Sequence, residues 1–304
     1  MCYTDGVKLV AKVKVVPTAE QRQLLKDTLY QANQAANEVS GVAWAAKCFR
    51  PFAIHKLVYA EVRQRYGLSA QMTVRVIGKV ADAYKAGKKR ERRFKKLGAI
   101  AYDSRILSWQ MEEQRISIWM MGGRQRMRYQ GGERQLELLE SQRGETDLAY
   151  IGGEFYLLAT CEVEEPEVKE VAGYLGVDLG IVNLATDSAG HVYAGGQVNG
   201  LRRRHAKLRG RLQSRGTKSA RRLLRKRSRK EQCFAADVNH CIAKELVEGE
   251  WHSLAERTGQ GIAIEDLRGI RERVRVRKAQ RRQHSAWAFD DLRKKIAYKA
   301  RLLG

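Results

Sequence analysis

Two short apolar runs that end in acidic residues are the parts of this chain best suited to chemistry. The first is GVDLG at 176–180, and it is followed by the turn sequence DSAG at 187–190. The second is GIAIEDL at 261–267. Both runs predict β-strands. A carboxylate inside a buried strand must be paired, protonated or bound to a cation, because an uncompensated buried charge is too costly.

Acids carried on neighbouring strands are typical of metal-dependent phosphodiester hydrolysis. That reaction needs carboxylates that converge on cations about 3.5–4 Å apart. We therefore predict that Asp178 and Glu265 are catalytic residues and metal ligands. The alternative is that each acid caps a nearby helix or pairs with an arginine. Asp266 competes with Glu265, because a shift of one residue would aim it inward instead. Asp187 is expected to be a turn residue.

The charge of the chain predicts a polyanionic partner. The 304 residues carry a formal net charge of +24, and 43% of them are hydrophobic, which is enough for a real core and about two domains. A positive charge of this size favours DNA or RNA as the partner over an anionic membrane surface. No apolar run approaches the roughly 20 residues needed to span a bilayer, and the first residues do not resemble a signal peptide. We expect a cytoplasmic protein without a membrane partner, associated with the nucleoid when bound to nucleic acid.

The most basic segment lies between the two acidic runs. Half of residues 201–230 are Lys or Arg and none is acidic. We predict one Arg-rich helix there, with cations around its whole circumference and no clean apolar face. Its self-repulsion would be relieved by a phosphate backbone, and such contacts would position nucleic acid without reading its sequence. The alternative is a solvated or disordered basic arm. The predicted nucleic-acid contacts are Arg202, Arg203, Arg204, Lys207, Arg211, Lys218, Arg221, Arg222, Arg225, Lys226, Arg271, Arg273 and Arg275.

The five cysteines predict reduced thiols rather than a disulfide framework. They are odd in number, scattered, and form no CxxC pair. Cys233, His240 and Cys241 cluster loosely enough to suggest zinc, but their spacing matches no standard ligand pattern. Structural thiols are the expected interpretation.

The remaining pattern predicts an α+β protein with several domains. Residues 7–16 alternate as a strand does, and Thr18 and Gln21 stand at capping-box spacing before a helix. Short apolar segments between Gly pairs over 99–163 indicate antiparallel hairpins. The cluster at 85–96 holds eight Lys or Arg among twelve residues. Further helices are predicted over 52–66, 72–84, 239–255 and 285–303, with an acidic linker at 162–170.

Several motifs together resemble the TnpB (OrfB) family of transposon-associated proteins, relatives of the type V CRISPR effectors. They are GVDLG (176–180), GTKSA (216–220), DVNH (237–240), IEDL (264–267) and the closing stretch from AWAF (286–289) to IAYKA (296–300). The resemblance is strong over about 174–300 and consistent in layout before that. The combination is specific, whereas either acidic strand alone would be weak.

The resemblance implies an N-terminal β-barrel interrupted by a helical recognition lobe, followed by a RuvC-like domain with a ribonuclease-H fold. The implied domains are a wedge-like barrel (1–16 with 97–170), the helical insert (17–96) and the nuclease domain (171–304). The implied activity is RNA-guided, Mg²⁺-dependent cleavage of DNA by two metals, with guide RNA and target DNA as partners. Asp178 then matches the first catalytic acid and Glu265 the second.

One departure from the family bears on activity. Family members continue into a CxxC…CxxC zinc ribbon and a third catalytic Asp, and neither is found in this sequence. The RuvC-like domain is therefore expected to be incomplete, with weak metal binding and poor or absent cleavage. The alternative function is a nuclease-deficient, RNA-guided or transposon-associated DNA-binding protein.

We expect the affinity of the chain for duplex DNA to fall steeply as salt is added. Each phosphate contacted by Lys or Arg should contribute about −0.9 to the slope of log K against log salt concentration, because counterions are released. Fluorescence anisotropy titrations at several salt concentrations measure this slope. A nearly flat dependence would contradict the polyanion prediction.

Overall fold

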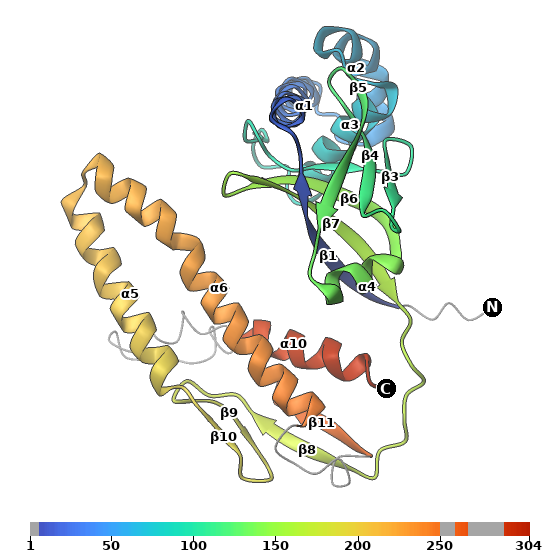
Figure 1. The fold of residues 1–304 in the computed structure, drawn as a ribbon. Helices are drawn as coiled ribbons and strands as arrows, with labels where there is room; N and C mark the ends of the chain where they lie inside the picture. The colour runs from blue at the N-terminus through green and yellow to red at the C-terminus, as the bar shows by residue number, and fades with distance from the viewer. Residues whose placement is uncertain (1–5, 250–258, 267–288) are drawn as a thin grey trace. The chain divides into compact units, whose positions relative to one another are not determined.

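The computed structural model describes residues 6–249, 259–266 and 289–304, and its architecture is mixed α+β (Figure 1). The chain divides into two compact units, one of residues 8–163 and one formed mainly by residues 164–304. Residues 164–172, where the first unit meets the second along the chain, lie in neither helix nor strand. The finer three-part division drawn from the sequence stays a prediction.

A seven-stranded, nearly closed β-barrel sheet forms the body of the first unit. Its spatial order is β2-β6-β7-β1-β5-β4-β3. The strands are β1 (Val7–Val16), β2 (Ile100–Tyr102), β3 (Leu107–Gln110), β4 (Arg115–Met120), β5 (Gly123–Gln130), β6 (Gln142–Ile151) and β7 (Glu154–Val163). The hairpins predicted over 99–163 are confirmed, and alternate residues of β7 are buried as a one-sided sheet requires.

Three helices lie between β1 and β2 in the chain and pack on one another. They are α1 (Ala19–Ala45), α2 (Pro51–Tyr66) and α3 (Ala70–Lys85). The capping box is confirmed: the Gln21 amide donates to Thr18 Oγ1 at 3.2 Å, and the Thr18 amide donates to Gln21 Oε1 at 3.1 Å. Buried residues of the helices and the sheet form one continuous core.

One helix of this unit was not predicted. The helix α4 (Glu133–Glu140) interrupts the series of hairpins and packs on β7. Leu139 is its buried residue, and Gln135 accepts a hydrogen bond from the Lys12 amide at 2.7 Å. Eight residues give too little periodicity to separate a short helix from a loop between strands, so contacts with the sheet decide the conformation.

A four-stranded sheet forms the base of the second unit, in the order β10-β9-β8-β11. Its strands are β8 (Gly173–Asp178), β9 (Asn183–Asp187), β10 (Val192–Ala194) and β11 (Gln260–Ile264). The first three pair antiparallel as consecutive hairpins, whereas β11 returns from far along the chain and pairs parallel with β8. Leu175 and Val177 of β8 are buried against helices of this unit.

Three helices complete the second unit: α5 (Gly196–Arg215), α6 (Lys218–Glu248) and α10 (Phe289–Arg301). A single Arg-rich helix over 201–230 is therefore wrong, because the chain reverses there. Gly216 ends α5 with a φ of 62°, a left-handed conformation that glycine adopts without strain. Thr217 then caps α6 by accepting from the Ala220 amide at 3.2 Å. The predicted helix over 239–255 is the end of α6 as far as Glu248, and residues 250–258 lie outside the described part.

Within the described residues, no helix combines the length and apolar character that crossing a bilayer requires.

A close backbone approach at Gly180 shapes the bend after Asp178. A Cβ at Gly180 would lie 2.6 Å from the Asn183 carbonyl oxygen. We expect Gly180→Ala to destabilise the second unit by about 1–3 kcal/mol, because two backbone segments must separate. A Cβ added at Gly200, inside α5, would meet no atom within 4 Å beyond its own stretch of helix. Gly200→Ala is the matched control and should be neutral or stabilising by up to about 1 kcal/mol. Thermal denaturation of both variants measures the difference, and equal melting temperatures would contradict it.

Candidate acidic edge and nucleic-acid interface

The pairing of β8 with β11 brings the two predicted catalytic acids to the same edge of the sheet. Ile264 stands opposite Val177 in this parallel pair. Asp178, the last residue of β8, follows Val177, and Glu265 follows Ile264 directly after β11. Both acids therefore lie at the carboxyl-terminal ends of the two paired strands. In a parallel pair, residues at equivalent positions point to the same face. The structure thus brings these two acids together from positions 87 residues apart, since 265 − 178 = 87.

Both acids are exposed within the described part of the chain. Leu175, Val177 and Leu179 are buried against the helices, and strand alternation places Asp178 on the opposite, exposed face. Glu265 is exposed as well. The expectation that Asp178 is a buried charge within a strand is therefore wrong: it is the last residue of β8 and is exposed.

Glu265 and Asp266 also border a surface depression formed by β11 and α10. Its lining includes Ile262, Ile264, Arg293 and Ile296. Glu265 and Asp266 are both exposed there, so burial does not decide which of the two is the predicted catalytic acid. The register of β11 favours Glu265, because it is the residue level with Asp178.

Asp187 has the turn role expected of it. Its Oδ1 accepts hydrogen bonds from the amides of Ala189 at 3.1 Å and His191 at 2.9 Å. Ser188, in the same turn, accepts from the Gly176 amide at 3.1 Å and so ties the turn to the middle of β8. The turn therefore fixes the strand that carries Asp178.

Carboxylate oxygens suit Mg²⁺, which prefers oxygen ligands and keeps several of its waters. Asp178 and Glu265 supply such oxygens at one exposed edge, so their chemistry fits the ion. No group of three or more His, Cys, Asp or Glu side chains placed to hold a metal occurs among the residues described. The zinc interpretation of Cys233, His240 and Cys241 gains no support there, since both thiols are free and exposed.

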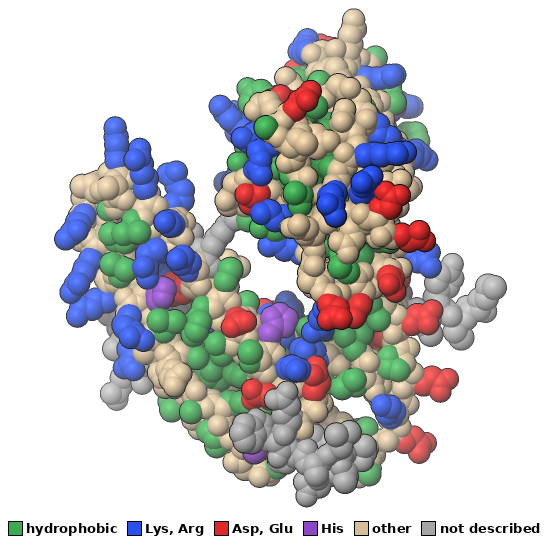
Figure 2. Space-filling model, viewed as in Figure 1, with side chains coloured by type: hydrophobic (Ala, Val, Ile, Leu, Met, Phe, Trp, Pro, Cys, Tyr) green, Lys and Arg blue, Asp and Glu red, His purple; other side chains and the backbone are tan. Residues whose placement is uncertain are grey.

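The helices α5 and α6 form an antiparallel hairpin that carries most of the predicted nucleic-acid contacts. Lys and Arg side chains gather over both helices (Figure 2). The exposed members of the predicted set are Arg203, Arg204, Lys207, Arg211, Lys218, Arg221, Arg222, Arg225 and Lys226, whereas Arg202 is half-buried. Arg271, Arg273 and Arg275 lie outside the described residues. The hairpin thus presents its cations on several sides.

An apolar stripe holds the hairpin together, contrary to the expectation that no such face survives. Leu201 and Leu208 are half-buried and Leu212 is buried, at helical spacing along α5. Leu212 of α5 and Leu224 of α6 line the same small pocket. The stripe is difficult to recognise in the sequence, because a few leucines define it among many evenly distributed arginines.

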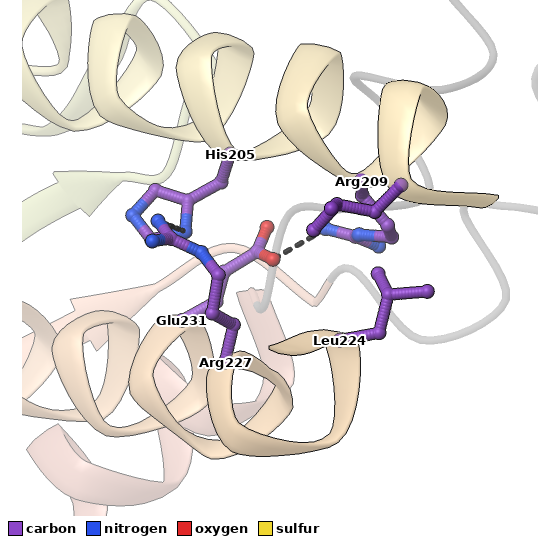
Figure 3. Close-up of a pocket in the computed structure, with 6 residues that line it drawn as sticks. His205, Arg209, Leu224, Arg227 and Glu231 are labelled. Carbon is purple, nitrogen blue, oxygen red and sulfur yellow. Dashed lines mark hydrogen bonds and ion pairs between the residues drawn. The ribbon is translucent and has the colours of Figure 1, made fainter. Parts of the chain in front are cut away.

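Glu231 is the acid that the sequence analysis missed. It is the first acid after Asp187, and its carboxylate pairs with Arg209 across the hairpin (Figure 3). Arg227 reaches His205 in the same pocket, with Nη2 and Nδ1 3.5 Å apart. Burial lowers the pKa of Arg202, and the charge of Glu231 opposes that shift. A single carboxylate therefore lies among cations of both helices.

Contacts with α10 fix the C-terminal part of α6. Asn239 is buried and donates to Asp291 Oδ2 at 2.7 Å, while Lys295 donates to Asp291 Oδ1 at 2.5 Å. Burial is the largest influence on the pKa of Asp291 and raises it, but the hydrogen bonds from Lys295 and Asn239 bring the pKa below its usual value. Phe289, Leu292 and Ile296 complete the apolar contact. The Asn of the DVNH motif thus has a structural role.

Comparisons with known proteins agree with the sequence motifs. The OrfB family model, described as a probable transposase, matches residues 159–268, a range that includes Asp178, the α5–α6 hairpin and Glu265. No curated protein sequence matches the chain. Among solved structures, the fold is similar to Cas12f1 in a cryo-EM structure of the Cas12f1–sgRNA–target DNA complex. That match has a TM-score of 0.61 at 11% identity, over 94% of this chain and 72% of that chain.

The family match confirms the predicted resemblance over residues 159–268, and the structural match shows that the fold is similar to that of Cas12f1. The family match covers the segment that holds both acids and the hairpin. The structural likeness, at 11% identity, concerns the fold. The particular roles of Asp178, Glu265 and the basic residues stay predictions.

We expect Glu231→Gln to destabilise the hairpin, with an effect that shrinks as salt rises. Partly exposed ion pairs contribute only about 0–1 kcal/mol, but removing this one also leaves the two basic helices without their internal counter-charge. The fall in melting temperature should be largest at low ionic strength, where repulsion is least screened. Glu170→Gln, an exposed acid of the segment before β8, is the charge-matched control. Equal shifts in the two variants, or a shift independent of salt, would argue against this role.

Proposed function

We propose that the chain is an RNA-guided, Mg²⁺-dependent DNA endonuclease of the TnpB type, with cleavage that is poor or absent in this chain because the third acid of the family is not found in its sequence. The observation that carries the proposal is the register of β8 with β11, which brings Asp178 and Glu265 to one exposed sheet edge. The match to the OrfB family over the same segment supports it. The proposal concerns a site, because a fold alone does not define an activity.

The topology of the second sheet supports a RuvC-like, ribonuclease-H-type domain. Three antiparallel strands, β10, β9 and β8, are followed in space by the parallel strand β11. The crossover from β9 and β10 to β11 carries the hairpin and the rest of α6. A strand that returns parallel beside the first strand places its carboxyl-terminal end next to the carboxyl-terminal end of β8. Such an arrangement lets carboxylates at the two strand ends act on the same phosphodiester.

Asp178 and Glu265 are the residues that would hold Mg²⁺. When bound, the ions activate water and stabilise the leaving oxygen of the phosphodiester. The contribution of the chain is to fix the two carboxylates on adjacent strands, on a face where a nucleic-acid strand can reach them. The Asp187 turn and the close approach at Gly180 hold the end of β8 in place.

The basic hairpin would bind the nucleic acids. Its exposed cations suit a phosphate backbone, which supplies affinity without sequence information. In RNA-guided recognition the sequence is read by base pairing between guide and target, and the protein reads the shape of the heteroduplex and a short flanking motif. Guide RNA and target DNA are accordingly the proposed partners.

We expect Asp178→Ala and Glu265→Ala each to abolish cleavage while leaving binding intact. The test uses the chain purified with the RNA that it carries, DNA complementary to that RNA, and Mg²⁺. Each substitution removes a carboxylate that is exposed in the described structure, so the fold should survive and the melting temperature should change little. Asp266→Ala is the matched control, because it removes the neighbouring carboxylate that is out of register with Asp178.

Two other results would change the conclusion. Cleavage retained in Asp178→Ala would remove that residue from the active site. Tight RNA-dependent binding of DNA without cleavage by the parent chain would replace the nuclease with the alternative, a guided DNA-binding protein.

A further inference from the structure

The segment that follows Asp178 joins β8 to β9 and consists of residues 179–182. None of these residues belongs to a helix or a strand. Leu179 is buried, and Ile181 packs against the core of the second unit. Because Asp178 is the last residue of β8, a displacement of this segment would also displace its carboxylate. We call residues 179–182 the β8–β9 segment.

The first turn of α5 holds the β8–β9 segment through two of its carbonyl groups. Asn199 Nδ2 donates a hydrogen bond to the Ile181 carbonyl at 2.7 Å. The amide of Gly195, the N-cap residue of α5, donates to the next carbonyl, that of Val182, at 2.8 Å. The Asn199 amide in turn donates to the Gly195 carbonyl at 2.8 Å. One turn of helix therefore binds two consecutive carbonyl groups of the segment.

Gly195 permits this contact because it has no side chain. A Cβ at this position would lie 2.5 Å from the Val182 carbonyl oxygen and 2.9 Å from Asn199 Nδ2. Its φ of −83° and ψ of 0° are values that other residues adopt in turns. The close approach, rather than the backbone conformation, is therefore what requires glycine here. A Cβ at the neighbouring Gly196 would meet no atom within 4 Å beyond its own stretch of helix.

Apolar side chains press the same parts of the unit together. Val198 of α5 and Leu184 of β9 are buried in the core that also contains Leu179. Burial of this kind is non-directional, so it brings α5 near the segment without fixing which atoms meet. A hydrogen bond has a defined length and direction. The half-buried Asn199 side chain therefore adds a geometric restraint that the apolar contact lacks.

Asn199 contributes little to its own helix. It lies four residues after the N-cap position, so its side chain is too far along α5 to cap the helix. Asn is also less favourable than Ala in a helix interior. Its side-chain nitrogen instead donates out of the helix, to a backbone carbonyl 18 residues earlier in the chain. The choice of Asn is therefore better explained by the segment that it binds than by the helix that carries it.

We propose that Asn199 is a positioning residue for the acidic edge, the strand ends that carry Asp178 and Glu265. By binding the Ile181 carbonyl, it sets the path of the β8–β9 segment and, through that path, the position of the Asp178 carboxylate. The inference rests on the proposed function for its consequence, which is tighter binding of Mg²⁺ by two carboxylates that are held in place. One helix of the basic hairpin is thereby tied to the acidic edge.

Two substitutions remove the Asn199 hydrogen bond in different ways. Asn199→Ala deletes the side-chain amide. Asn199→Asp keeps its shape but turns an oxygen, instead of an N–H group, toward the Ile181 carbonyl. A carboxylate near the N-terminus of a helix stabilises that helix, so this variant separates loss of the bond from loss of helix stability. Thermal denaturation verifies that both variants stay folded.

NMR without any metal measures the position of the segment, so that an absence of cleavage cannot affect the result. The reporters are the exchange rate of the Gly195 amide, which is bonded to the segment, and the chemical shifts of Asp178. We expect both Asn199 variants to exchange the Gly195 amide faster by roughly three- to tenfold, the effect of one net hydrogen bond, and to shift the Asp178 signals. An unchanged exchange rate, or unchanged Asp178 signals, in the folded variants would overturn the proposal.

A pair of adjacent glycines disturbs the same contact without altering Asn199. Gly195→Ala places a methyl group against the Val182 carbonyl, whereas Gly196→Ala adds the same group in open space and is the matched control. We expect Gly195→Ala to shift the Asp178 signals and Gly196→Ala to leave them at their parental values. Equal shifts in the two glycine variants would count against the positioning role.

A titration with Mn²⁺, followed by electron paramagnetic resonance, tests the consequence for metal binding. Mn²⁺ prefers the same carboxylate ligands as Mg²⁺. We expect the Asn199 variants to bind Mn²⁺ roughly tenfold more weakly than the parent chain, the lower end of the effect of residues that orient a metal ligand. Asp178→Ala should lose the site.

The Mn²⁺ titration distinguishes failure of this inference from failure of the proposed function. Parental Mn²⁺ affinity in both Asn199 variants would overturn the positioning role while the metal site remained. A parent chain that binds Mn²⁺ no better than Asp178→Ala would instead refute the proposed function. The NMR measurement would then still decide whether Asn199 positions Asp178.

Discussion

The parallel pairing of β8 with β11 is the contact on which the proposed active site depends. It joins two strands separated by the whole basic hairpin, and its register alone makes Asp178 and Glu265 neighbours. The helices α6 and α10 cover the opposite face, where Leu175, Val177 and Ile296 are buried. A shift by one residue would exchange the two faces and bury the acids. The apolar residues on the covered face therefore determine which carboxylates remain exposed.

Repulsion between cations is the second constraint, since the chain carries a net charge of +24. Individual polar groups placed among the cations help to offset it in both units. Glu231 lies among the cations of the hairpin, and Asp291 pairs with the buried Lys295 of α10. In the first unit, Asn37 bonds the backbone of Phe94, while most cations of the cluster at 85–96 stay exposed. In both units, order is imposed on cations that remain exposed.

The family match and the structural likeness bear on different questions. The OrfB match covers the residues that would act, and the likeness to Cas12f1 concerns the architecture around them. Exposed carboxylates at one sheet edge and a basic hairpin in the same unit form a consistent set for a protein that handles nucleic acid.

The sequence by itself determined the charge, the strand and helix types, the capping box at Thr18 and the two acid-bearing strands, because these depend on local composition and periodicity. The helix α4, the break at Gly216 and the exposure of Asp178 were decided by the tertiary structure. Short helices need a sheet to pack on, and the face of a strand depends on what covers it. Glu231 and Asn37 looked ordinary in the sequence. Their partners, Arg209 and Phe94, lie 22 and 57 residues away, and only the packing of helices brings them together.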